Sequence, residues 1–323
     1  MNFRSPLILS PSSLQIHYSS NILSIGSCFA QNIAHNLTEL KYNLLANPAG
    51  ICFNPVSVLH TIKRCIKGDS LPETEIINSH GLWCHHDFHG SFNHPDKNTC
   101  IQSINSSIEK ANNFLKSVDR VILTIGTAYV YELENHVVNN CHKRPQNLFN
   151  KRRLAREEIK NTLFELIELL NAYSNQKIEY ILTLSPVRHL KDGMVQNNLS
   201  KATCLLAIDD VVQSDANVHY FPSYELLMDD LRDYRFYAKD RVHPSEEAIE
   251  YVFNKFEQVH LYENDAALRK RIAKLNLALA HRPFNPESDQ HILFKEDLVA
   301  QLTELEQAYS FLDFTKEKQE LLS

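Results

Sequence analysis

The sequence predicts an α/β protein built on a parallel sheet, because apolar strand-like runs alternate with segments of helical periodicity. The strand-like runs lie at 21–26, 119–126, 177–185 and 217–223, with a weaker one at 42–47. Each of the stronger runs is almost continuously apolar, which is typical of parallel strands covered on both faces by helices. We therefore expect a doubly wound domain over about residues 1–260.

The segments between these runs carry apolar residues at helical spacing. After the first strand-like run, Phe29, Ile33 and Leu37 recur at intervals of four residues within 28–40. Segments 156–173 and 245–259 show the same periodicity, and each begins with acidic residues that favour a helix N-terminus. These three segments are predicted to be amphipathic helices.

Two regions depart from this alternation. Residues 68–100 combine glycines and prolines with a histidine cluster, and we expect a long insertion or lid there. From about residue 263 the pattern is purely helical, with one apolar stripe at Leu268, Ile272, Leu275 and Leu279. We therefore expect a main domain at 1–262 and a helical hairpin at 263–323, which supports stability or homo-oligomer formation and supplies no catalytic group.

Composition excludes several classes of protein. The 323 residues carry a net charge of -6, so no basic field attracts nucleic acid or anionic lipid. No apolar run approaches the roughly 20 residues of a membrane helix, and the first residues contain no secretory signal. The seven cysteines lack Cys-x-x-Cys spacing, which indicates reduced thiols. We expect a cytoplasmic protein without a cofactor or a membrane or nucleic-acid partner.

The first strand-like run ends in a turn that carries two candidate nucleophiles. Gly26 ends the strand and Cys28 begins the helix, so Ser27 and Cys28 lie at the carboxyl edge of the sheet, where α/β proteins place their sites. A thiol at a helix N-terminus is expected to have a lowered pKa, especially beside a histidine. The structural alternative is a tight turn in which Ser27 caps the helix.

A second motif lies after the last strand-like run. Asp240 precedes His243 by three residues in a loop that leads into an N-capped helix. An aspartate in this position can orient the imidazole, so that its other nitrogen faces a nucleophile. Asp-x-x-His is weak evidence alone, but it becomes informative together with the turn at Ser27 and Cys28.

Several ordered motifs resemble those of the GSCFA family, which is itself similar to the SGNH (GDSL-like) hydrolases. They are "GSCFA" (26–30), "NPAGICFNP" (47–55), "LTIGTAYVYE" (123–132), "TLSPVRH" (183–189) and "DRVHPS" (240–245). The resemblance implies a three-layer α/β/α sandwich with a five-stranded parallel sheet, of flavodoxin-like, SGNH hydrolase type, followed by the C-terminal helical extension. The implied chemistry is ester hydrolysis or acyl transfer, often on carbohydrates.

The resemblance also implies roles for individual residues. Aligned without a gap on the Gly-Asp-Ser block of the superfamily, Cys28 falls on the nucleophilic serine, with Ser27 as the runner-up. His243 and Asp240 match the last block, as base and orienter. The backbone amides of Cys28 and Gly50 are implied oxyanion donors.

One block departs from the superfamily pattern. Its Gly-x-Asn-Asp is here Gly126-Thr127-Ala128-Tyr129, so the asparagine that donates to the oxyanion is missing. Losing one such donor costs about 3 kcal/mol of transition-state stabilisation unless another group replaces it. Asn54, Thr127 or a backbone amide are the candidate replacements, and Gly126 is expected to line the substrate site. The departure leaves open a degenerate site that binds without turnover.

Two further groups of residues are candidate substrate contacts. In the histidine-rich segment 80–94, Trp83 is a candidate platform for a sugar and His89 a candidate contact, whereas a structural metal site or an ordinary polar loop are the alternatives. Arg188 and His189 follow the fourth strand, where the arginine could bind a carboxylate or phosphate or pair with a nearby acid. The resulting prediction is an acyl-ester hydrolase or O-acyltransferase acting on a small or carbohydrate-linked ester, and the alternative is a non-enzymatic binding module.

Overall fold

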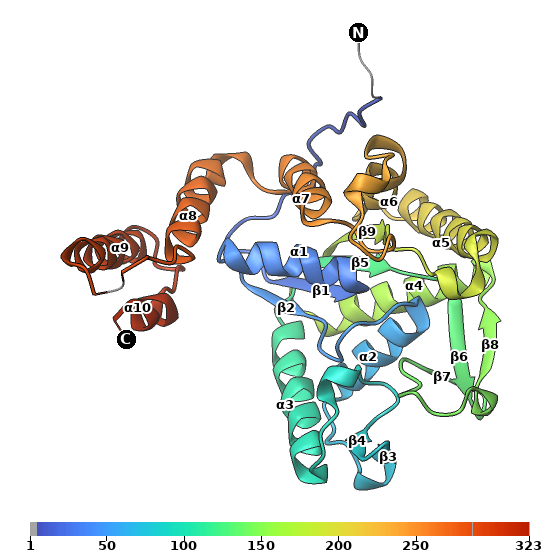
Figure 1. The fold of residues 1–323 in the computed structure, drawn as a ribbon. Helices are drawn as coiled ribbons and strands as arrows, with labels where there is room; N and C mark the ends of the chain where they lie inside the picture. Colours follow the sequence, from blue (N-terminus) through green and yellow to red (C-terminus); the bar gives the residue numbers. More distant parts are fainter. Residues whose placement is uncertain (1–4, 286, 323) are drawn as a thin grey trace.

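A five-stranded, fully parallel sheet forms the centre of the protein in the computed structural model, which describes residues 5–285 and 287–322 (Figure 1). The strands lie in the order β2-β1-β5-β9-β10. Their bounds are β1 Ile22–Gly26, β2 Leu44–Ala46, β5 Arg120–Ile125, β9 Glu179–Leu184 and β10 Val218–Tyr220. The α/β class and all five strand-like runs of the sequence are thereby confirmed.

Helices cover both faces of this sheet, as the apolar strands predict. Alternate residues of each strand point to opposite faces. In β1, Leu23 and Ile25 join the core cluster under α2, α3, α4 and α5, whereas Ile22 joins the cluster under α1 and α7. The bounds are α1 Cys28–Glu39, α2 Pro55–Lys67, α3 Lys97–Leu115, α4 Arg156–Tyr173, α5 Met194–Ser214 and α7 Glu246–His260.

The chain reverses its direction of travel across the sheet between β1 and β5. From β1 it passes to β2 on one side, and from β2 it returns to β5 on the other side of β1. In open α/β sheets a crevice forms at such a switch point, outside the carboxyl ends of the strands. Gly26 ends β1 and Gly126 follows β5, so both glycines lie at this crevice.

Two small antiparallel sheets extend the carboxyl edge. Residues 68–100, predicted as an insertion or lid, contain the 3-10 turns Glu73–Glu75 and Gly90–Phe92, the hairpin of β3 (Ile77–Ser79) and β4 (Leu82–Cys84), and the start of α3. A three-stranded sheet, ordered β7-β6-β8, was not predicted from the sequence. Its strands are β6 Tyr129–Leu133, β7 His136–Val138 and β8 Asn150–Arg153, which mix polar and apolar residues without the strong alternation of a half-buried strand.

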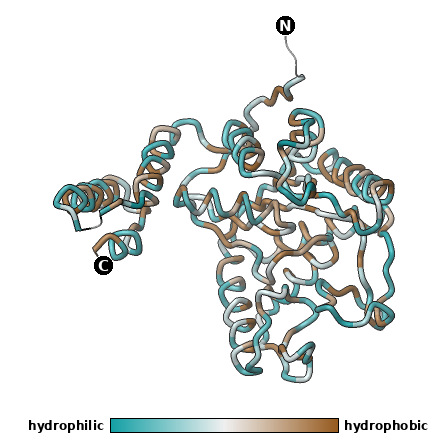
Figure 2. Tube along the Cα trace, viewed as in Figure 1, coloured by the Kyte–Doolittle hydropathy of each residue, from teal (hydrophilic) through white to brown (hydrophobic). Residues whose placement is uncertain are grey.

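Further short turns and helical segments connect the strands and helices. They are the 3-10 turns Gln146–Leu148, Leu190–Asp192, Tyr234–Phe236 and Glu263–Asp265, the short helix α6 (Ser223–Glu225) and the π-turn Leu226–Asp230. Hydrophobic residues concentrate along the central strands and on one side of each helix, whereas the connecting loops are mostly hydrophilic (Figure 2). No helix in residues 5–285 and 287–322 is long and apolar enough to cross a bilayer.

The C-terminal segment is helical, as predicted, and it extends from the main body beside α1 and α7 (Figure 1). It comprises α8 (Ala266–Leu279), α9 (Asp289–Ala308) and α10 (Thr315–Leu322), so a third helix joins the expected pair. Helix α9 begins at Asp289, because Ser288 caps it by accepting the backbone N–H of His291.

The C-terminal helices share one hydrophobic core with α1. Ile272 of α8 and Leu302 of α9 lie in the same cluster as Ile33 of α1. A hydrogen bond from Asn276 Nδ2 to the carbonyl of Glu39, 2.7 Å long, ties α8 to the end of α1. The extension is therefore packed against the main body.

We predict that Ile272→Ala destabilises the whole protein by about 3 kcal/mol, because it removes a fully buried side chain and leaves a cavity. Leu277→Ala, on the same helix but 76% exposed, is the matched control and should cost less than about 0.5 kcal/mol. Urea unfolding followed by circular dichroism measures both. Equal, small effects for the two variants would show that α8 is not part of the folded core.

Candidate active site

The turn from β1 to α1 depends on the absence of a side chain at Gly26. This residue has φ +134°, and a Cβ here would lie 2.0 Å from the carbonyl oxygen of Thr124 on β5. Only glycine adopts such a conformation without strain and permits so close an approach of two strands. The next amide, that of Ser27, donates to the same Thr124 carbonyl at 3.1 Å. The end of β1 is thereby fixed against β5.

Ser27 and Cys28 differ in what their side chains do. Ser27 is 2% exposed, and its Oγ accepts the backbone N–H of Phe29 at 3.3 Å as the N-cap of α1. Cys28 is the first residue of the helix, and its side chain is half-buried. The capping role expected for Ser27 is present, and Cys28 is the more accessible of the two.

The thiol of Cys28 does not have the lowered pKa expected from its position. Burial raises its pKa, and a hydrogen bond with its own backbone N–H offsets this effect in part. The sequence-based prediction of a lowered pKa was wrong, because it considered only the effect of the helix terminus. Desolvation disfavours the thiolate and has the larger effect.

Asp240 and His243 form the pair that their spacing predicts. His243 Nδ1 lies 2.7 Å from Asp240 Oδ2, and Asp240 Oδ1 accepts the backbone N–H groups of Val242 and His243. The hydrogen bond from the His243 ring, together with these two, lowers the pKa of Asp240 to about 2. With the carboxylate on Nδ1, the other ring nitrogen, Nε2, carries no hydrogen bond to any residue in the described parts of the chain.

His189 lies beside the β1–α1 turn. Burial is the main cause of its lowered pKa, and the charges of Lys201, Lys151 and His243 contribute to the shift. A Cβ built on Gly126 would lie 3.5 Å from His189 Nε2 and 3.4 Å from the Cβ of Ser27. The ends of β1, β5 and β9 thus meet around Gly126, although no hydrogen bond joins the His243 ring to Ser27 or Cys28 within the described residues.

The expected oxyanion donors are mostly engaged elsewhere. The Gly50 amide donates to the carbonyl of Asn47 at 2.7 Å, so it is not free in this structure. Thr127 is also committed: its amide donates to the carbonyl of Phe53 at 2.9 Å, and its hydroxyl bonds the Ser200 hydroxyl at 2.9 Å. In this structure the Gly50 amide and Thr127 are therefore not available as oxyanion donors, contrary to the expectation from the sequence.

Asn54 retains part of its hydrogen-bonding capacity. It caps α2, where Oδ1 accepts the amide of Ser57 and Nδ2 donates to the Ser57 hydroxyl at 3.0 Å. An amide nitrogen has two protons, so one N–H of Asn54 remains. Asn54 and Thr127 both line a cavity of about 450 Å³ beside the carboxyl edge.

This cavity lies against the antiparallel sheet that the sequence did not predict. Tyr129 and Tyr131 of β6 and Lys151 of β8 line it, together with His89 and His189. The ammonium group of Lys151 lies 4.7 Å from the ring centre of Tyr129 and 5.2 Å from that of Tyr131, and it pairs with Asp192. Two of the expected substrate contacts, His89 and His189, are therefore at the cavity.

The other residues that the sequence predicted for the site are not among those that line this cavity: Ser27, Cys28, Gly50, Trp83, Gly126, Arg188, Asp240 and His243. Trp83 packs on the small core cluster under the hairpin, with the ammonium group of Lys97 5.5 Å from its ring centre. Arg188 lies 4.9 Å from the ring centre of Tyr237, and no acid in the described residues pairs with it. Since Tyr237 bridges to Pro244, Arg188 lies beside the loop of His243 rather than in the cavity.

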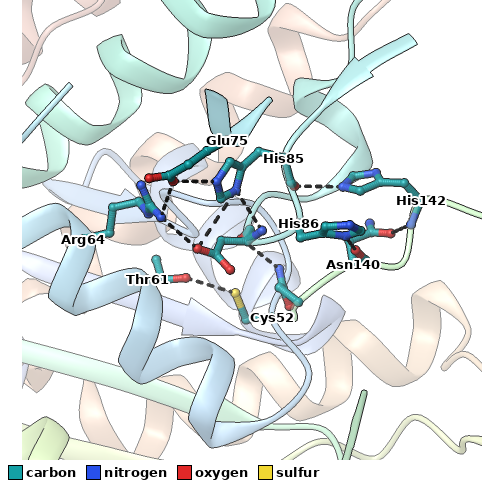
Figure 3. Close-up of polar contacts among 10 residues, drawn as sticks. Cys52, Thr61, Arg64, Glu75, His85, His86, Asn140 and His142 are labelled. Carbon is teal, nitrogen blue, oxygen red and sulfur yellow. Dashed lines mark hydrogen bonds and ion pairs between the residues drawn. The ribbon is translucent and has the colours of Figure 1, made fainter. Parts of the chain in front are cut away.

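The histidine-rich segment forms a hydrogen-bonded network that joins loops (Figure 3). Arg64 of α2 contacts Glu75 at 2.9 Å and Asp87 at 3.1 Å, and His85 Nε2 contacts Glu75 at 3.0 Å. The other nitrogen of His85 accepts the amide of Asp87, and His142 donates to the carbonyl of His85. These nitrogens are already used, and the described residues include no group of three His, Cys, Asp or Glu side chains placed to hold a metal ion.

Sequence reasoning missed a buried cation under the site. Lys201 of α5 is 2% exposed, and its ammonium group donates to the carbonyls of Gly126 at 2.7 Å and Ser185 at 2.6 Å. Burial lowers its pKa to about 7. A signal was present, because Lys201 occupies the buried stripe of α5 with Cys204 and Ile208, where an apolar residue is expected.

Comparison with known protein families gives two matches. A model described as the GSCFA family matches residues 21–256, and one described as GSCFA domain protein, C-terminal domain, matches residues 272–323. No curated protein matches the chain. The first match spans both the turn at Cys28 and the pair of Asp240 and His243.

We predict that Lys201 makes folding stability rise with pH. Its pKa is about 7 in the folded protein and about 10.4 in an unfolded chain, so between these values the unfolded state binds more protons. Stability should therefore increase by up to about 1.4 kcal/mol per pH unit from this group, and the gain is absent below pH 7.

Urea unfolding at pH 7, 8 and 9 tests this prediction. The rise should be lost in Lys201→Met and kept in Lys274→Met, which replaces an exposed lysine of α8. The same pH dependence in wild type and Lys201→Met would contradict the prediction.

Proposed function

Because this chain belongs to the GSCFA family, we propose that it is an acyl-ester hydrolase or O-acyltransferase of the SGNH type. The proposed groups are Cys28 as nucleophile, His243 as base and Asp240 as orienter. The observation that carries the proposal is the 2.7 Å contact of Asp240 with His243 Nδ1, which leaves Nε2 without a partner among the described residues. This is the base-and-orienter arrangement that nucleophilic catalysis requires.

The topology of the sheet supports the SGNH assignment. Numbered in chain order, the five parallel strands lie as 2-1-3-4-5, which is the flavodoxin-like order. The proposed nucleophile follows the first strand, at the switch point, and the proposed base follows the last strand.

Accessibility supports Cys28 over Ser27 as the nucleophile. The Ser27 hydroxyl is buried and already accepts a hydrogen bond as a helix cap, whereas the thiol of Cys28 is half-buried. A thiol also ionises closer to neutral pH than a hydroxyl does. Ser27 remains the alternative, since the two residues share one turn.

The proposed reaction has two steps. Cys28 Sγ attacks the carbonyl carbon of the acyl ester, its proton passes to His243 Nε2, and the ester C–O bond breaks as that proton passes to the departing alkoxide. A thioester on Cys28 results. Water, or a hydroxyl of an acceptor molecule, then gives its proton to His243 and attacks the carbonyl carbon of the thioester. The C–S bond breaks, the acyl group leaves as a carboxylic acid or a new ester, and His243 returns the proton to Sγ, which restores the thiol.

The cavity supports a small or carbohydrate-linked ester as substrate. Its volume of about 450 Å³ is sufficient for a small molecule. The rings of Tyr129 and Tyr131 provide apolar surface, and Asn140 provides an amide group that suits the hydroxyls of a sugar.

The second candidate is a binding module that has lost turnover. Two observations favour it: burial raises the pKa of Cys28, and the Gly50 amide is bonded to Asn47. A protein of this kind would bind an ester in the cavity without forming a covalent intermediate.

Exposure of the protein to p-nitrophenyl acetate and to an acetyl thioester, followed by intact mass spectrometry and peptide mapping, tests the proposal. We expect an added acetyl group on Cys28, lost in Cys28→Ala and retained in Ser27→Ala. Cys65→Ala is the matched control, since Cys65 is buried in the core and should not affect labelling. A label on Ser27 would assign the nucleophile to the serine, and no specific label with either donor would favour the binding module.

A further inference from the structure

The imidazole ring of His189 is largely buried, yet it has no hydrogen-bond partner among the described residues. Its backbone N–H donates to Asn197 Oδ1 at 2.9 Å, and its ring meets Phe53 edge-on with 5.6 Å between ring centres. Neither ring nitrogen has a hydrogen-bond partner in residues 5–285 and 287–322. The ring also lines the cavity, so a ligand can reach it.

Gly126 brings the His189 ring close to the β1–α1 turn, because it has no side chain to separate them. A Cβ at this position would be 3.5 Å from His189 Nε2, 3.4 Å from the Cβ of Ser27 and 3.0 Å from the carbonyl oxygen of Phe53. Nε2 is therefore the atom of His189 that lies nearest to Gly126, where the end of β5 meets the turn that carries Ser27 and Cys28. A donor is needed near this turn, because the oxyanion asparagine expected after β5 is missing and the Gly50 amide is engaged.

We propose that His189, as a neutral imidazole, donates its Nε2–H to the oxyanion that develops when the nucleophile attacks the acyl carbonyl. This inference rests on the proposed acyl-transfer function and names the group that takes the place of the missing asparagine. A donor that is already oriented in a dry site stabilises the transition state without reorganisation.

The surroundings of His189 keep it neutral and suit it to this role. Burial, together with the positive charges of Lys201, Lys151 and His243, lowers its pKa to about 4, and Asp192 opposes this shift. At neutral pH the ring is then a weak base but still has one N–H to donate, and a neutral imidazole can polarise a carbonyl. His243, which is exposed and bonded to a carboxylate, is the group suited to take the proton.

Lys201 holds the backbone next to His189 in place. Its ammonium group binds the carbonyls of Gly126 and Ser185, which follow β5 and β9, and so it fixes these two strand ends relative to each other. Lys201 is a positioning residue, because it is buried and is not among the residues that line the cavity.

The test compares two reactions of the same nucleophile. Acylation by p-nitrophenyl acetate develops an oxyanion, whereas alkylation by iodoacetamide displaces iodide from a saturated carbon and develops none. We expect His189→Ala to slow the acylation of Cys28 by about 10²- to 10³-fold relative to wild type. The alkylation rate of Cys28 should stay within about twofold of the wild-type rate. His189→Gln, which retains an N–H donor and cannot titrate, should recover at least about tenfold of the lost rate.

His60→Gln is the matched control, since His60 is a half-buried histidine of α2 outside the cavity, and both rates should remain unchanged. Thermal unfolding shows that each variant is folded. Unchanged acylation in His189→Ala would overturn the inference while the proposed function stands, and so would equal slowing of acylation and alkylation. If wild type is not acylated at all, the proposed function fails and the inference fails with it.

Discussion

The close contact of Gly26 with the Thr124 carbonyl is the constraint on which the carboxyl edge of the sheet depends. It holds the end of β1 against β5, and the amide of Ser27 bonds the same carbonyl. The Gly26 amide donates to Asn47 Oδ1 at 2.8 Å, and its carbonyl accepts the amide of Cys52 at 2.9 Å. One residue without a side chain thus joins two strands and a loop. Any larger residue would move the turn that carries both candidate nucleophiles.

Two histidines at this edge have opposite surroundings, and the difference supports different roles. His243 is 48% exposed and bonded to the carboxylate of Asp240, so its imidazolium form has a counter-ion and solvent. His189 is largely enclosed, has cations near it, and its pKa falls to about 4. A histidine bonded to a carboxylate and a second, buried histidine with a lowered pKa are suited to divide proton transfer from charge stabilisation.

The sequence predicted the features that depend on local pattern. All five parallel strands and the pair of Asp240 and His243 could be identified, because buried strands are apolar throughout and the pair lies within four residues. It did not predict the sheet of β6, β7 and β8, whose strands mix polar and apolar residues. It also placed Trp83 at the substrate site, expected a free Gly50 amide and omitted Lys201. The positions of Trp83 and Lys201 depend on contacts between residues distant in the chain, whereas the Gly50 amide is engaged by Asn47, three residues earlier, in a local turn.

The alkylation rate of Cys28 as a function of pH, in wild type and in His243→Ala, tests most directly whether the two ends of the sheet form one site. Iodoacetamide labelling with peptide mapping gives this rate for each cysteine separately. If His243 assists the thiol, His243→Ala should shift the Cys28 profile upward by about one pH unit or more, because an imidazolium favours the thiolate. The profile of Cys141, which is half-buried and lines the cavity, should not change, because burial and Lys191, and not His243, shift the pKa of its thiol. Identical Cys28 profiles in the two proteins would contradict the account.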